Sequence, residues 1–90
     1  MMDYIQMYFG LTDAQYNRLT DQHKSILDYI AAFGSITPMD AFQALHITKL
    51  ATRISEMKAL GIQFEQTYES RKNGAGKSVR YMRYRKAAAA

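Results

Sequence analysis

Residues 34–61 read GSITPMDAFQALHITKLATRISEMKALG, and this stretch decides the fold. Thr37 followed by Pro38 is a strong helix start, because Thr caps free amides and Pro suits the first helical position. Beyond it, apolar residues recur at steps of three and four, as they do along the buried face of a helix. The pattern predicts two helices, over residues 38–45 and 49–60.

The connection between these two helices is very short. His46 and Ile47 form a tight turn, Thr48 is the expected N-cap of the second helix, and Gly61 is expected to close it. Two short helices joined in this way are typical of a helix-turn-helix unit. The second helix of such a unit fits the major groove of DNA, which is wide enough to admit it.

Working outward, a further helix is expected before this unit and a hairpin after it. Thr20 is the predicted cap of a helix over 21–33, which ends at Gly34. After Gly61 the apolar period changes from helical to alternating, which predicts a strand over 62–69. A Gly-rich loop at 71–78 and a return strand over 79–85 complete the hairpin. The predicted fold is mainly α with a small β-hairpin, a three-helix core followed by a wing.

The outward face of the helix over 49–60 is the candidate base-reading surface. If Leu50, Ile54, Met57 and Leu60 face the core, the remaining positions are available to DNA. Arg bonds a guanine edge bidentately, Thr offers a hydroxyl or methyl group to bases, and Lys near a helix start suits phosphate. The alternative is an ordinary solvated helix surface. The candidate residues are Thr48, Lys49, Thr52, Arg53 and Glu56.

The hairpin supplies the second candidate surface. Cations release condensed counterions from DNA, and glycines let backbone amides approach the phosphate chain. The alternative is a solvated loop without a partner. Because side chains alternate along a strand, Arg80 is expected on the face opposite Arg83. The candidate residues here are Arg71, Lys72, Asn73, Lys77, Arg80 and Arg83.

Charge is distributed unevenly along the chain. Two basic and five acidic residues give residues 1–48 a net charge of −3, whereas ten basic and three acidic residues give residues 49–90 a net charge of +7. This asymmetry favours a polyanionic partner. The chain has no Cys, its two histidines (His23, expected at the surface, and His46) do not make a metal site, and no paired carboxylates suggest hydrolysis. We therefore expect neither catalysis nor a cofactor.

The ends of the chain lie outside the predicted core domain of 20–86. Residues 1–19 are expected to form an apolar arm or short helix, which packs on the domain, joins two chains in a homodimer or binds a foreign protein. Residues 87–90 are a low-complexity alanine tail, typical of a remnant added for expression. No apolar run approaches the roughly 20 residues that span a bilayer, so no membrane contact is expected, and the predicted location is the cytoplasm of a bacterium or phage-infected cell.

Several of these residues together resemble a known family. The entry Gly34-Ser35-Ile36-Thr37-Pro38, followed by Ala41, Leu45, Ile47, Leu50-Ala51, Arg53-Ile54 and Gly61, is similar to the winged helix-turn-helix domains common in phages and mobile elements. The resemblance covers residues 20–86 and implies a DNA-binding fold, with a recognition helix at 48–60 and a wing at 71–78. Many members have Gly where this chain has His46, a position that favours a left-handed backbone.

Two functions of different class follow. The first is a non-catalytic protein that binds double-stranded DNA, either a transcriptional regulator or an excisionase-like factor of a phage or mobile element. The second is a protein-interaction module, such as an inhibitor of a host enzyme, built on the same scaffold, because fold does not fix function. The apolar arm favours the second, and the basic half of the chain favours the first.

Overall fold

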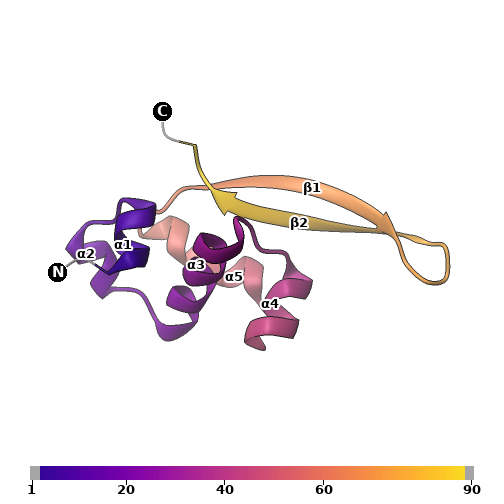
Figure 1. The fold of residues 1–90 in the computed structure, drawn as a ribbon, viewed down its shortest axis with the longest axis horizontal. Helices are drawn as coiled ribbons and strands as arrows, with labels where there is room; N and C mark the ends of the chain where they lie inside the picture. The colour runs from indigo at the N-terminus through magenta and orange to yellow at the C-terminus, as the bar shows by residue number, and fades with distance from the viewer. Residues whose placement is uncertain (1–2, 89–90) are drawn as a thin grey trace.

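The computed structural model describes residues 3–88, over which the chain forms five helices and then one antiparallel hairpin (Figure 1). The predicted mainly helical fold with a small hairpin is confirmed. The first two residues of the predicted arm and the last two of the predicted alanine tail lie outside the described residues. The molecule is elongated, 49 × 29 × 22 Å, because the hairpin extends past the helices.

Helices α3 (Asp21–Phe33) and α4 (Pro38–Leu45) have the predicted bounds, and α5 (Leu50–Ala59) is one residue shorter at each end. Thr20 and Thr37 cap α3 and α4, each accepting a backbone N–H three residues on. The prediction that Thr48 caps α5 is wrong. Lys49 is the N-cap and no side chain bonds the first turn, because its backbone (φ −121°, ψ 56°) departs from ordinary cap geometry.

The turn between α4 and α5 depends on His46, which adopts the left-handed conformation at φ 57°. Its backbone N–H donates to Phe42 O at 3.1 Å, and the next amide, Ile47 N–H, donates to Ala41 O at 3.0 Å. These bonds satisfy carbonyls that the end of α4 would leave free. A non-glycine residue is rare in this conformation, although His is among the residues that tolerate it better.

The hairpin is longer than predicted and its loop is shorter. Strand β1 (Phe64–Lys72) pairs with β2 (Ser78–Lys86), from Phe64 opposite Lys86 to Lys72 opposite Ser78. Arg71, Lys72 and Ser78 therefore belong to the strands, since nothing in their chemistry interrupts a ladder, and the loop is residues 73–77. At the base, Ile36 forms an isolated bridge with Tyr84, which joins the helical part of the chain to β2.

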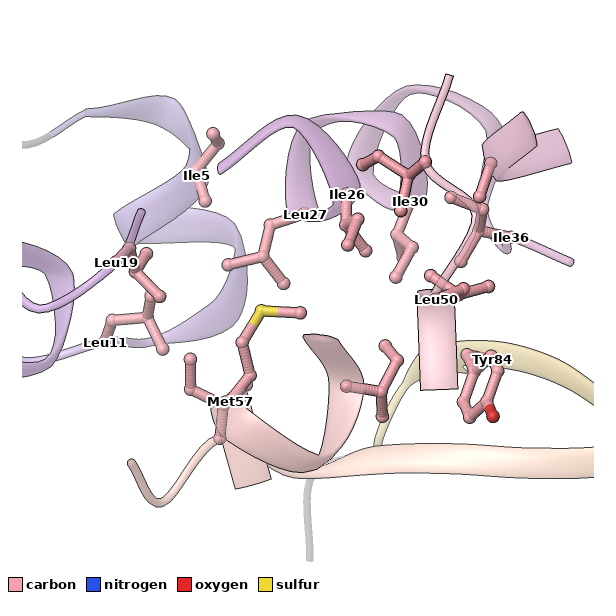
Figure 2. Packing of buried hydrophobic residues seen from close by; sticks show 14 residues of the cluster. Ile5, Leu11, Leu19, Ile26, Leu27, Ile30, Ile36, Leu50, Met57 and Tyr84 are labelled. Carbon is pink, nitrogen blue, oxygen red and sulfur yellow. The ribbon is translucent and has the colours of Figure 1, made fainter. Parts of the chain in front are cut away.

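The core lies between α3, α5 and the base of the hairpin (Figure 2). Tyr84 enters it from β2. Burying each large aliphatic side chain contributes about 1.5–3 kcal/mol, so this cluster accounts for most of the stability available to so small a chain. The largest fully buried side chains are Ile26, Leu27, Ile30, Ile36, Ile54 and Met57.

The N-terminal segment packs on its own domain. It contains α1 (Tyr4–Phe9) and α2 (Asp13–Asn17), and it buries Ile5, Leu11 and Leu19 in the same core. The Phe9 ring also lies 6.3 Å from that of Phe64 at the start of β1. Packing on its own domain, which is one of the arrangements expected for this arm, is therefore present in the structure.

Three apolar residues that the helical pattern assigns to the buried side are in fact exposed. Phe33 is 71% exposed and packs against Tyr29, with ring centroids 4.6 Å apart and ring planes tilted by 42°. Met39 and Phe42 are 52% and 53% exposed, because the buried face of α4 is centred on Ala41. The apolar positions of α3 and α4 therefore extend beyond the core onto the exposed surface.

Candidate nucleic-acid interface

The face of α5 that points away from the core carries short, uncharged side chains. With Leu50, Ile54 and Met57 buried, the helical repeat of 3.6 residues turns Thr52 and Ala59 most directly outward, with Ser55 beside them. All three are exposed, as are Thr48 and Lys49 before the helix. Ser55 is absent from the sequence-based candidates, although the same helical spacing would have included it.

Arg53 does not lie on this outward face, which corrects the sequence-based interpretation. Its side chain is only 27% exposed, and its Nη1 donates to Glu56 Oε1 at 3.1 Å. The Nε of Arg53 is buried without a hydrogen-bond partner among the described residues. Position 53 falls at the edge of the buried stripe, where a long side chain bends along the helix toward an acidic neighbour.

The Glu56 carboxylate contacts two side chains, one on α5 and one on α3. Besides Arg53, its Oε1 lies 2.8 Å from Nε2 of His23, which is buried on α3. The backbone N–H of Thr20 donates to Nδ1 of this ring at 3.1 Å, so the neutral ring carries its proton on Nε2 and donates it to Glu56. The expectation that His23 is a surface residue is wrong, because it caps α3 and connects it to α5.

The wing contains a group of exposed basic side chains. Arg71, Lys72 and Lys77 are exposed, and no acidic side chain occurs between Ser70 and Met82. Figure 1 shows this end of the hairpin lying beyond all the helices. These three cations are therefore placed to meet an external polyanion.

The other predicted wing residues have structural partners. Asn73 Oδ1 accepts the amides of Ala75 at 2.9 Å and Lys77 at 3.1 Å, which shapes the loop. The guanidinium of Arg80 lies 5.3 Å from the centre of the Tyr68 ring, a cation–π contact.

Arg83 anchors the base of the wing. Its Nε donates to Glu69 at 2.8 Å and its Nη1 to Ser35 Oγ at 2.8 Å, so it links both strands to the segment before α4. The hydrogen bond from Arg83 lowers the pKa of the Glu69 carboxyl. Arg83 is thus held by the protein itself and is not part of the exposed basic surface.

Lys58 and Lys49 complete the exposed cations of α5. Lys58, in the last turn, hydrogen-bonds Gln66 on β1 and so connects the recognition helix to the wing. Sequence analysis did not select it. Its exposure and position one turn beyond Ser55 are the signals that could have found it.

Residues 3–88 were also compared with the requirements of a metal site and of a membrane span. No group of three His, Cys, Asp or Glu side chains in this range converges as a metal site. None of the helices described is both long and apolar enough to cross a bilayer.

Comparison with known proteins identifies a family for most of the chain. A family model described as a winged helix-turn-helix domain matches residues 21–86. No curated protein and no solved structure matches the chain. The matched region begins with α3 and ends with β2, so it contains both candidate surfaces and leaves out α1 and α2.

Proposed function

The chain belongs to the winged helix-turn-helix domain family, a DNA-binding fold, and from this premise we propose that it binds double-stranded DNA without catalysis. In this proposal the exposed face of α5 enters the major groove and the wing contacts the phosphate backbone. The observation that carries it is the wing itself, whose exposed Arg71, Lys72 and Lys77 have no acidic neighbour between residues 70 and 82.

We assign the reading of bases to side chains that differ in part from the candidates chosen from the sequence. Thr48, Thr52 and Ser55 are exposed and short, so they offer hydroxyl and methyl groups to base edges. Arg53 and Glu56 bond each other and Glu56 also bonds His23, which supports a role in fixing α5 rather than reading bases. Lys49 and Lys58, at the two ends of the helix, are assigned to phosphates.

A salt titration of duplex binding tests the proposal. We expect the affinity of the wild type for random duplex to fall steeply with salt, with a slope of about −0.9 for each phosphate neutralised. Replacing Arg71, Lys72 and Lys77 by Ala should make the slope shallower by about 0.9 for each phosphate that the variant no longer neutralises. Arg18→Ala, which removes an exposed cation from the acidic half, is the matched control and should leave the slope unchanged.

The titration also separates specific from general binding once a preferred site is known. Thr52→Ala should weaken binding to that site by about 1–3 kcal/mol and relax the preference at one base pair. Equal weakening on specific and random duplex would instead make Thr52 a backbone-binding residue. If wild type fails to bind duplex even at low salt, the DNA-binding proposal is wrong.

Within DNA binding, we propose a transcriptional regulator or an excisionase-like factor of a phage or mobile element as the cellular role. A regulator would protect a single operator, whereas an excisionase-like factor would protect repeated sites and bend the DNA between them. Footprinting on the DNA that flanks its own coding sequence distinguishes the two. The second candidate function, binding of a host protein, is favoured by the exposed Phe33, Met39 and Phe42.

A further inference from the structure

The outer edge of β2 opens onto a groove that the proposed DNA contacts leave unexplained. This groove, about 550 Å³ in volume, separates the start of α4 from the wing. Its walls combine apolar side chains with guanidinium groups. Those that the argument uses are Pro38, Met39 and Asp40 on one side and Val79, Arg80 and Arg83 on the other.

The hydrogen bonds at the two ends of the hairpin fix which groups β2 turns outward. In an antiparallel pair, alternate residues direct both backbone groups toward the partner strand and the others direct them away. Tyr84 directs both away from β1, because its N–H and C=O bond Ile36 at 2.9 Å each. At the other end, Asn73 N–H donates to Lys77 O at 2.8 Å, which gives the same alternation. Met82, Arg80 and Ser78 therefore present their N–H and C=O groups on the side of Tyr84.

This edge is left open where α4 begins. Within the part of the chain that the structure describes, Ile36 is the single residue that pairs with the outer side of β2. Two residues later, Pro38 has no N–H to donate and starts a helix that diverges from the strand. The row of free groups from Met82 to Ser78 thus faces a groove with a helix as its opposite wall.

The side chains around this edge are apolar or positively charged. Met39 and Val79 are 52% and 41% exposed. Asp40 is the acidic residue of the groove, and its carboxylate accepts the Thr37 amide at 3.0 Å. Arg83 is bonded to Glu69. The charge left available to a partner is therefore positive, from Arg71 and Arg80.

We propose that an extended acidic segment of a partner protein adds to the outer edge of β2 as a further strand. Its backbone would pair with Arg80 and its neighbours. On the face of the hairpin that carries Arg80, its acidic side chains would meet that guanidinium group. On the opposite face, which carries Arg71 and Val79, an apolar side chain would lie between Met39 and Val79. Strand addition of this kind draws affinity from main-chain hydrogen bonds and specificity from side-chain pockets. The proposal does not depend on DNA binding.

Other occupants fit these groups less well. A second copy would bring its own Arg80 and Lys77 against the same charges, which is how basic residues protect sheet edges from self-pairing. DNA would satisfy the guanidinium groups, but its phosphates offer no ladder for alternating N–H and C=O groups. Helix α1 and the last residues of β2 lie at the opposite end of the molecule from the wing loop (Figure 1).

Backbone hydrogen exchange with a designed peptide tests the proposal. The probe is a short synthetic peptide of alternating Glu and Val, added to the full chain. We expect the amides of Arg80 and Met82 to exchange about tenfold more slowly with the peptide, because local opening must then also break the added strand. The amides of Val79 and Tyr81, which face β1, are internal controls and should change little.

Four comparisons decide the result. The same peptide with N-methylated Val residues cannot donate to the edge, and the removal of about two hydrogen bonds should weaken its binding about tenfold or more. Arg80→Gln combined with Arg71→Gln should weaken the unmethylated peptide while leaving the ladder intact. Equal binding of both peptides would mean a purely ionic contact and would overturn the proposal. Slower amide exchange that results from raising the protein concentration alone would also overturn the proposal. So would an equal slowing of exchange by random duplex DNA.

Discussion

At the scale of single residues, Gly61 shows how closely the N-terminal segment is fitted to α5. Its φ of +94° lies in the left-handed region, and a Cβ there would come within 2.9 Å of Nε2 of Gln15. That nitrogen donates to Leu60 O at 3.0 Å, and the Oε1 of the same side chain accepts the Thr12 amide. One glutamine therefore serves two helix ends, and glycine leaves it the room to do so.

Gly61→Ala should lower the free energy of unfolding by about 1–3 kcal/mol, because a strained backbone and a steric clash act together. Repeating the substitution in a Gln15→Ala background removes the clash and leaves the backbone strain. Urea denaturation of the four proteins gives the coupling energy. An identical destabilisation in both backgrounds would show that Gln15 does not crowd this position.

A second residue-scale prediction concerns Glu69. Since its hydrogen bond to Arg83 lowers the native pKa, the unfolded chain binds more protons at acidic pH. The stabilisation from this pair is therefore complete above the ordinary Glu pKa of about 4.3 and disappears as the pH falls through the lower native pKa.

Thermal unfolding of wild type and Glu69→Gln across this pH range checks the prediction. The difference in melting temperature between the two proteins should shrink as the pH falls. A constant difference down to the lowest pH would mean that the ion pair contributes no pH dependence.

At the scale of elements, α1 and α2 act as part of the core although they lie outside the family match. Ile5, Leu11 and Leu19 are buried, and Lys86 at the end of β2 lies 5.0 Å from the centre of the Tyr8 ring. The segment thus holds the junction between α5 and the wing. Its exposed Tyr4 and Met7 do not alter this conclusion.

Deleting residues 1–11 should cost about 3 kcal/mol or more, because two large aliphatic side chains leave the core. The solution mass per particle should remain that of a monomer before and after the deletion. Urea denaturation and light scattering measure the two quantities. A fall in particle mass on deletion would instead identify the segment as a dimer contact.

Sequence patterns predicted the elements better than the directions of side chains. Thr20, Gly34 and Thr37-Pro38 are local signals, so the bounds of α3 and α4 followed from them directly. Arg53 and His23 did not, because a residue at the edge of a helical stripe takes the direction its neighbours allow. Those neighbours, Glu56 and Thr20, come together in three dimensions through the packing of α3 against α5. The predicted ends of the strands were wrong for a related reason. Charged residues are found within paired strands as readily as in the loops that follow them.

At the scale of the whole molecule, the charge asymmetry of the sequence becomes a separation in space. The acidic half of the chain forms α1 to α4, whereas the exposed cations between Arg71 and Arg80 lie along the projecting wing. Such a dipolar arrangement orients the protein during its approach to a polyanion. The wing should therefore meet the DNA first.

Stopped-flow association with duplex tests this orientation. Lys77→Glu should lower the association rate constant more than it raises the dissociation rate constant, and the effect should diminish as salt is added. Arg18→Glu makes the same charge change on the acidic half and should slow association less. Comparable slowing by both variants would mean that only net charge matters.

The loop of the wing also has a consequence for how such a protein changes over generations. Residues 73–77 are all exposed and are shaped by the side chain of Asn73, without any support from the helices. Substitutions and insertions here escape the constraints that packing imposes on α3 or α5. Descendants of this chain can therefore vary the length and sequence of the loop while inheriting the rest of the fold unaltered.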